Sequence, residues 1–276
     1  MIDKTRKNKD WDIRVMTDME HTISILLEVY AYSHAYKIAR TLPDFSPKVL
    51  YLLELLKERR ELNVAYAFQH RAENRLIEDR HQVKLLLNEA QEEEQTANYL
   101  LDLAAKVKNG EIIDFVRSVS PVLYRLFLRL LEQAVPDVQS YIIDTKNDQY
   151  DTWNFKAMEK ADNDLFRSYL AQRQPRHVTT RSLADLLVLS ELPADIKRLV
   201  VVLRQFEKSV RNPLAHLIKP FDEEELYRTT HFSSQAFLDG LIRLAVFSGV
   251  NYIKEPFYFD VVNAVIEKEL LDSAKP

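Results

Sequence analysis

The sequence contains no cysteine, and this absence excludes several kinds of chemistry at once. Disulfide bonds, thiolate nucleophiles and cysteine-ligated zinc sites all require that residue. A reducing cytoplasm is consistent with the composition. Long hydrophobic runs are also missing: the longest clean apolar stretches, such as residues 49–53, are far shorter than a membrane span. The basic N-terminal stretch lacks the apolar segment that follows it in a signal peptide.

Glycine is nearly absent, with three residues in a chain of 276, whereas an average protein contains roughly 7%. Tight hairpins, phosphate-cradling loops and dinucleotide-binding fingerprints all depend on glycine. The sequence therefore argues against sheet-rich folds, P-loop enzymes and Rossmann enzymes. Leucine, alanine and charged residues are abundant instead, and together they predict an all-α protein.

The net charge is −4, which does not favour broad, non-specific binding of a nucleic-acid duplex. Residues 191–220 are nevertheless locally positive, with six basic and three acidic side chains. This segment suits a small pocket for a short single strand better than a duplex groove. A solvated helix face explains the individual lysines equally well.

Apolar residues recur at helical spacing along most of the chain. Thr17 to Glu20 form a capping box for a helix that continues through His34, and Ser46-Pro47 begin the next one. Asn109-Gly110 is a stop signal. The other predicted helices cover approximately residues 72–92, 95–108, 111–134, 155–172, 181–190, 194–211, 233–248 and 258–272.

A polar stretch at residues 144–154 is the best candidate for a domain boundary. We therefore expect a helical domain over residues 1–145 and a second helical domain over residues 146–276. No internal repeat accompanies this division.

The strongest chemical signal is the segment Arg211-Asn212-Pro213-Leu214-Ala215-His216. Arginine can hold a phosphate through two parallel hydrogen bonds, and histidine can move a proton near neutral pH. Two other pairs, Arg14 with His21 and Arg75 with His81, have similar spacing, and roughly 1.5 such pairs are expected by chance. Only the third pair has a small polar residue directly after the arginine.

The residues between Arg211 and His216 predict a junction between two helices. Pro213 disfavours helical backbone at Asn212, and asparagine followed by proline is a common helix start. One helix would end near Arg211 and the next would begin at Pro213. Its free N–H groups would attract a phosphate. The alternative is a capping and packing arrangement, which is the commoner meaning of a helix-end arginine near a histidine.

Two further patterns carry less weight. Glu78 and His81 have the Glu-x-x-His spacing of di-iron helical bundles, but no second copy of that pattern exists in the chain. We therefore expect no metal and no cofactor. His231 precedes a helix start and is either a second site residue or a loop histidine near a cap.

At Arg211, Asn212 and His216 the chain resembles the HEPN ribonuclease superfamily, and within it the Csm-type ancillary ribonucleases of type III-A CRISPR systems. The resemblance implies a helical, six-helix-like domain over residues 1–145 followed by a HEPN bundle over residues 146–276. In that family an α/β CARF domain that senses cyclic oligoadenylate precedes the helical part. These residues begin directly in helix, so activation by cyclic oligoadenylate is expected only where a CARF domain is present elsewhere.

The resemblance also implies a function and a mechanism. The chain is expected to be a cytoplasmic homodimer with a composite active site that cleaves single-stranded RNA without a metal. Arg211 would hold the phosphate, His216 would move the proton of the 2′-hydroxyl reaction, and Asn212 would support them. Two alternatives remain: a HEPN-fold RNA-binding or scaffold protein without turnover, and the toxin of a toxin–antitoxin pair.

Overall fold

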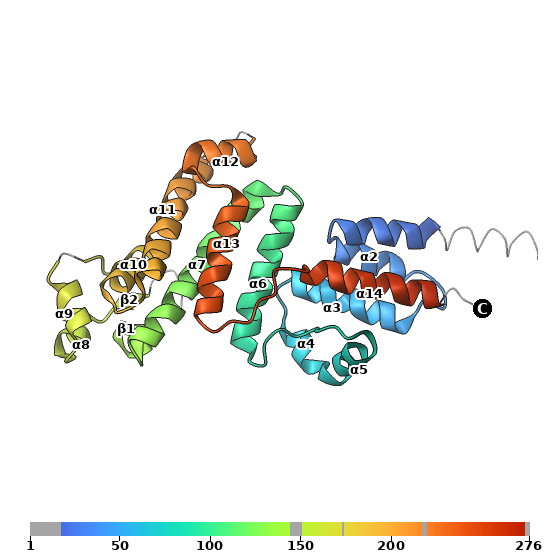
Figure 1. The fold of residues 1–276 in the computed structure, drawn as a ribbon, viewed down its shortest axis with the longest axis horizontal. Coiled ribbons are helices and arrows are strands. Elements are labelled where there is room, and N and C mark those ends of the chain that lie inside the picture. The colour runs from blue at the N-terminus through green and yellow to red at the C-terminus, as the bar shows by residue number, and fades with distance from the viewer. Residues whose placement is uncertain (1–17, 144–150, 173, 217–219, 274–276) are drawn as a thin grey trace, which may run out of the picture. The chain divides into compact units, whose positions relative to one another are not determined.

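The computed structural model describes residues 18–143, 151–172, 174–216 and 220–273, with the side chains of 211–216 outside the description. The fold is all-α, as the composition predicts (Figure 1). The strands in the described part are two residues long: β1 (Ile142–Ile143) pairs antiparallel with β2 (Thr152–Trp153). The chain divides into two compact units, residues 1–105 with 251–276 and residues 106–250.

The first unit is built around helix α3 (Pro47–Arg60), whose apolar side chains Val49, Leu52 and Leu56 are fully buried. Helices α2 and α14 pack against α3. Burial of this continuous apolar surface is the main force that holds the unit together. Its other described elements are residues 18–28, α2 (Tyr32–Ala39), α4 (Ala65–Gln69), α5 (Arg71–His81), most of α6 (Gln91–Lys108) and α14 (Tyr258–Ser273).

The second unit is centred on α7 (Ile112–Ala134), which packs against α10, α11 and α13. One face of α7 is apolar and buried, as its helical periodicity requires. The unit also contains η1 (Val138–Tyr141), β1, β2, α8 (Phe155–Lys160), α9 (Asp164–Leu170), α10 (Thr180–Leu189), α11 (Ala194–His216), α12 (Glu223–Thr230) and α13 (Ser234–Phe247).

Strong local signals fix several helix ends where the sequence predicts them. Pro47 occupies the first turn of α3, directly after Ser46. Gly110 has φ +72° after α6, a left-handed conformation that glycine adopts without strain. The predicted start at Thr17 lies outside the described residues.

Long-range contacts with helix α14 accompany a break in the first predicted helix. The helix expected from Met19 to His34 is broken between residue 28 and α2, where Tyr30 has φ +57°. Helix α14 stabilises this break: Tyr30 Oη donates to Asp260 at 2.7 Å, and Asn263 Nδ2 donates to the carbonyl of Leu27 at 2.9 Å. The second of these bonds satisfies a backbone carbonyl near the end of the first helix.

The helix expected over residues 72–92 instead ends with α5 at His81, and residues 82–90 form an irregular segment. Two carboxylates accept the backbone N–H groups of this segment. Glu78 accepts from Leu85 at 2.6 Å, and Glu94 accepts from Leu87 at 2.9 Å and from Asn88 at 2.7 Å. The helix expected over residues 155–172 is likewise divided into α8 and α9, because the Asn163 side chain caps α9.

The compact units do not divide the chain at residue 145. The second unit begins near residue 106, because α7 packs with α10, α11 and α13. The C-terminal helix α14 belongs to the first unit through its packing on α3. The boundary between residues 145 and 146 as a division between functional domains therefore stays a prediction.

A buried ion pair organises the first unit. Arg59 and Glu94 have no exposed side-chain surface and lie 2.5 Å apart, from Arg59 Nη2 to Glu94 Oε1. Arg59 also donates to Asn98 and to the Leu85 carbonyl, and its guanidinium lies 4.7 Å from the centre of the Tyr258 ring. Burial raises the pKa of Tyr258 to about 12, so its hydroxyl stays protonated and donates to the Leu85 carbonyl at 2.9 Å.

Replacing Glu94 with alanine is expected to lower the free energy of unfolding by about 3–5 kcal/mol, because Arg59 would remain as an unpaired buried charge. Urea denaturation followed by circular dichroism measures this. The control is Arg243→Ala, whose ion pair with Asp195 is about half exposed and should cost less than about 1 kcal/mol. Equal effects of the two substitutions would show that the buried pair does not organise the unit.

Candidate active site at the end of helix α11

Helix α11 is held in place by one apolar face. Ile196, Val200, Leu203, Phe206 and Val210 are each 3% exposed or less and recur at helical spacing. They pack against α7, α10 and α13, and Figure 1 shows α11 beside these helices. A helix of 23 residues, such as α11, spans roughly 35 Å. This packing fixes the position of the helix axis, and the candidate site residues lie along the same helix.

Helix α11 packs closely against α13 at Gly240. A Cβ atom at Gly240 would lie 2.9 Å from Cδ2 of Leu203 and 3.3 Å from Cδ1 of Leu199. One turn away, the rings of Phe206 and Phe237 stack with their centres 3.7 Å apart. The missing side chain at position 240 therefore lets the two helices pack closely.

Arg211, Asn212 and His216 occupy the last two turns of α11, which continues as a helix to His216. The predicted helix junction at Asn212-Pro213 is therefore wrong, and so is the helix start predicted there as an anion site. Proline removes one backbone hydrogen bond and disfavours helix at the residue before it. The long buried face of α11 outweighs this local preference, since tertiary packing supplies most of the stability of a helix in a protein.

An unbroken helix changes how the candidate residues relate to one another. Five residues correspond to about 140° around a helix axis beyond one full turn, so positions 211 and 216 lie on different sides of α11. Positions 212 and 216 are neighbours one turn apart. A single copy of α11 thus presents the arginine and the histidine positions in different directions.

The sequence interpretation overlooked a buried polar cluster one turn before Arg211. Glu207 is 2% exposed, although it lies between Phe206 and Val210 on the packed side of α11. Its Oε2 accepts a hydrogen bond of 2.7 Å from Thr180 Oγ1 at the start of α10, and it lies 3.2 Å from Nη1 of Arg204. The sequence does contain a signal for this cluster, which is an acidic residue inside an otherwise apolar helical pattern.

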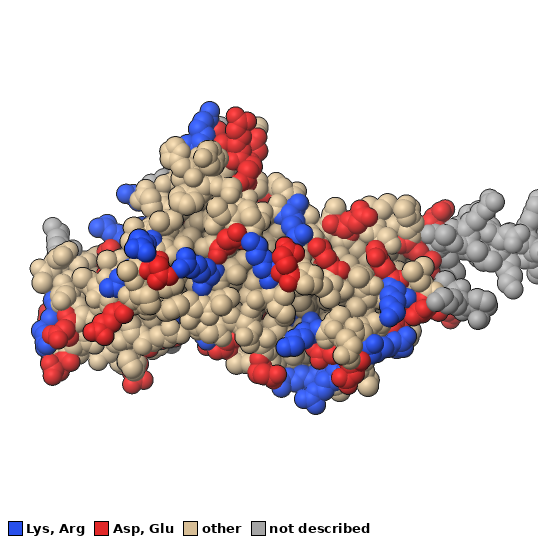
Figure 2. Space-filling view, in the orientation of Figure 1, with Lys and Arg blue, Asp and Glu red and all other residues tan. Residues whose placement is uncertain are grey.

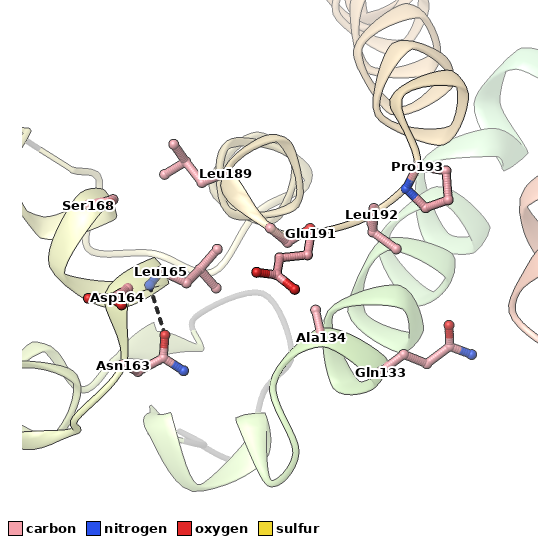
Figure 3. A pocket seen from close by; sticks show the side chains of 11 residues that line it. Gln133, Ala134, Asn163, Asp164, Leu165, Ser168, Leu189, Glu191, Leu192 and Pro193 are labelled. Carbon is pink, nitrogen blue, oxygen red and sulfur yellow. Dashed lines mark hydrogen bonds between the residues drawn. The ribbon is translucent and has the colours of Figure 1, made fainter.

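A hollow in the second unit lies at the other end of α11 (Figure 3). Its volume is about 510 Å³, and its wall includes Asn163 and Leu165 of α9, Leu189 of α10 and Glu191 before α11. The Asn163 side chain is occupied with the backbone of Leu165, which donates to it at 2.9 Å. The hollow ends at Pro193, roughly 27 Å along the helix from residue 211. It is therefore separate from the Arg211–His216 segment.

The other residues that the sequence singled out, Glu78, His81 and His231, each contact another residue of the chain. Glu78 accepts the backbone N–H of Leu85, and His81 Nε2 lies 2.8 Å from Glu269 Oε1, so the two side chains serve different contacts. Among the described residues, no three His, Asp or Glu side chains are arranged to hold a metal ion. His231 ends α12 in a left-handed conformation, with its ring edge-on to Tyr227.

The surface shown in Figure 2 carries interspersed positive and negative side chains rather than one broad basic face. This agrees with the mixed charge of the sequence. Helices long and apolar enough to cross a membrane are absent from the described part of the chain.

Comparison with protein families identifies the chain. The family model described as the Cas_Csm6 HEPN domain matches residues 85–267, which is well over half of the chain and includes all of α11. The chain belongs to the Csm6 HEPN family. The resemblance at Arg211, Asn212 and His216 is thus confirmed at the level of the family, while the roles of these three residues stay predictions.

A solved structure supports the Csm6 HEPN assignment at the level of the fold. Csm6 of Enterococcus italicus, solved with bound cyclic hexa-2′-fluoro-hexa-dAMP, is 14% identical and superposes with a TM-score of 0.67. The match covers 92% of this chain, and the chain spans 57% of the length of that protein. A comparison with curated proteins gave no match.

The close packing at Gly240 predicts the effect of a larger side chain. Gly240→Leu is expected to destabilise the protein by about 1–3 kcal/mol, because α11 and α13 must separate to admit the new atoms. Thermal unfolding measures the change. Ala236→Leu adds a side chain of the same kind at an exposed position of α13 and should have little effect. If the two variants unfold alike, Gly240 is not a point of close contact.

Proposed function

We propose that this chain is a metal-independent endoribonuclease that cleaves single-stranded RNA and serves type III CRISPR antiviral defence in the cytoplasm. One observation carries the proposal: Arg211, Asn212 and His216 lie at the end of a packed helix, inside the segment that the Csm6 HEPN family model matches. The same residue types suit phosphate binding and proton transfer. The likeness to Enterococcus italicus Csm6 supports the fold on which this chemistry would operate.

The proposed reaction is attack of a ribose 2′-hydroxyl on the adjacent phosphorus. The new O2′–P bond forms as the P–O5′ bond breaks, which gives a 2′,3′-cyclic phosphate and a free 5′-hydroxyl. The 2′-hydroxyl loses a proton and the departing O5′ gains one. His216 moves one of these protons, as base or as acid, and water exchanges the other; an imidazole can do either near neutral pH. Arg211 stabilises the negative charge that grows on the phosphoryl oxygens.

Asn212 has a narrower role than its sequence context indicates. Because α11 is unbroken, this residue does not cap a new helix. It lies one turn before His216, where i,i+4 side chains are neighbours. We therefore assign Asn212 the support and orientation of the imidazole alone.

We further propose that two copies of the chain complete the active site. Positions 211 and 216 lie on different sides of α11, so a second copy across a two-fold axis would bring a complementary pair of side chains to each motif. The exposed face of the same helix carries two apolar residues, Val201 at 53% and Val202 at 37% exposure. Adjacent apolar side chains on an exposed helix face suit a contact with another chain.

We expect regulation of the cleavage activity to depend on whether a sensor domain accompanies this chain. The Enterococcus protein binds a cyclic oligoadenylate analogue. A cyclic oligoadenylate activator enters this proposal only where a CARF domain acts together with this helical chain.

Substitution of the two proposed catalytic residues tests the reaction. His216→Ala and Arg211→Ala should each reduce cleavage of single-stranded RNA in EDTA at least about 100-fold, because each removes charge or proton transfer from the transition state. A gel assay with 5′-labelled RNA measures the rates, with DNA of the same sequence as a substrate that should not be cut.

The matched control is His231→Ala, which removes an exposed histidine at the end of α12 and should leave cleavage unchanged. Full activity in either catalytic variant would refute the assignment. RNA binding without cleavage by the unmodified chain would instead indicate a binding or scaffold protein.

Introducing charge on the exposed face of α11 tests the composite site. Val201→Glu with Val202→Glu should shift the mass measured by light scattering from dimer to monomer and abolish cleavage, because the buried carboxylates would lack partners. Leu271→Glu, at 69% exposure on α14, is the control and should remain a dimer. An active monomer would contradict the two-copy site.

A further inference from the structure

A second hollow lies in the first unit, between helices α2 and α3, which pack against each other. The volume of this α2–α3 hollow is about 500 Å³. The charged side chains that line it are Lys37 of α2, Arg40 directly after α2, and Glu54 and Lys57 of α3. Three cations and one carboxylate give the lining a positive charge, whereas the whole chain carries −4. A concave positive surface concentrates anions, including phosphate groups.

The carboxylate of the hollow, Glu54, interacts with two tyrosine hydroxyls. Tyr66 Oη donates to Glu54 Oε2 at 3.1 Å. Burial first, and then a hydrogen bond to Glu54, raise the pKa of Tyr36, so its hydroxyl also stays protonated at neutral pH. These interactions direct the carboxylate toward the tyrosines.

The ring of Tyr36 holds two of the cations beside the hollow. Cζ of Arg40 lies 5.6 Å from the ring centre, and Nζ of Lys57 lies 5.9 Å from it. The negative face of an aromatic ring attracts a cation at such distances. Lys57 Nζ also lies 2.5 Å from Glu58 Oε1, so this ion pair balances its charge. Arg40 and the exposed Lys37 therefore supply most of the positive charge of the hollow.

A group of aromatic rings adjoins the hollow through Tyr66. The Tyr66 ring stacks on His70 with the ring centres 4.1 Å apart, and the Tyr51 ring centre lies 6.3 Å from that of Tyr66. All three residues are half-buried, so part of each reaches the surface. Proteins that bind single-stranded nucleic acid combine aromatic rings, on which bases stack, with cations that hold the phosphates. The same combination is present here.

We propose that the α2–α3 hollow binds a phosphate group of single-stranded RNA, with a neighbouring base on the stacked Tyr66–His70 pair, and this rests on the proposed ribonuclease function. The Arg40 guanidinium donates to the phosphate oxygens, and Lys37 adds a second positive charge. The Tyr36 ring restrains Arg40, which reduces the side-chain freedom that binding would otherwise remove. The first unit thereby contacts the substrate strand without any residue of α11.

Neutralising the two cations tests the phosphate contact. Lys37→Gln with Arg40→Gln should weaken binding of a fluorescein-labelled, 2′-O-methylated single-stranded RNA about tenfold at low salt, because the phosphate loses both charges. Methylation of the 2′-hydroxyls prevents internal attack, so affinity is measured without turnover. The slope of log Kd against log salt should fall by about 0.7, the contribution of one phosphate on a single strand. Fluorescence anisotropy at several salt concentrations gives both quantities.

The matched control is Arg75→Gln with Lys84→Gln. It makes the same charge change at two exposed positions of the first unit that do not line the hollow. Its affinity and salt slope should equal those of the parent chain. All four substituted side chains are exposed, so circular dichroism and the melting temperature should stay unchanged in both double variants.

Two pairs of single variants test the aromatic residues. Tyr36→Leu should weaken RNA binding because Arg40 loses its ring, whereas Tyr36→Phe, which keeps the ring, should bind as the parent chain does. His70→Ala should weaken binding about fivefold or more, and His70→Phe, which restores a ring for stacking, should recover the affinity.

A loss of affinity confined to the hollow variant, with a smaller salt slope, would support the proposal. Equal losses in the two double variants, no loss in either, or a parent chain that does not bind the RNA would overturn it. RNA binding that depends on Lys37 and Arg40, without cleavage of unmethylated RNA, would defeat the ribonuclease function and leave the binding site intact.

Discussion

The buried face of helix α11 is the constraint on which the candidate site depends. Its apolar residues from Ile196 to Val210 are covered by α7, α10 and α13, with close packing at Gly240. A helix anchored along this length continues through Pro213 despite the local cost of proline. Positions 211 and 216 therefore belong to one continuous helix and lie on different sides of its axis. This supports the two-copy site that we propose.

Two buried carboxylates, Glu94 and Glu207, have different sets of partners. Glu94 meets Arg59, and its second oxygen accepts three N–H groups of residues 87 and 88, including the Asn88 side chain. Both oxygens of Glu94 are thus paired, and the arrangement holds residues 85–88 beside α3 and α14. Glu207 has a hydroxyl and one cation on a single oxygen. Glu94 thus fixes an irregular segment, whereas Glu207 joins α11 to the start of α10.

The parts of the fold that followed from the sequence are those in which neighbouring residues decide the structure. Asn109-Gly110 and Ser46-Pro47 act within one turn of chain, and the structure has the helix end and helix start that they predict. Residues distant in the sequence decided other parts of the fold. The break at Tyr30 depends on Asp260, which is 230 residues away. The local spacing of apolar residues does not indicate such contacts.

The residues of the candidate site region also differ in how far the sequence alone predicts them. Arg211 and His216 could be selected because their spacing and residue types carry a chemical meaning within six residues. The hydrogen bond of Glu207 could not be predicted from the sequence. It depends on Thr180, 27 residues earlier, and on which face of α11 packs inward. The helix junction predicted at Pro213 failed because local propensity was weighed without the packing of the whole helix.

The identity of the RNA ends produced in EDTA tests the central claim most directly. Mass spectrometry of the products distinguishes internal attack by a 2′-hydroxyl from attack by an activated water. The account predicts fragments that end in a 2′,3′-cyclic phosphate, each followed by a fragment with a 5′-hydroxyl, in the absence of divalent metal. Fragments with 3′-hydroxyl and 5′-phosphate ends, or cleavage that stops when EDTA is added, would contradict it.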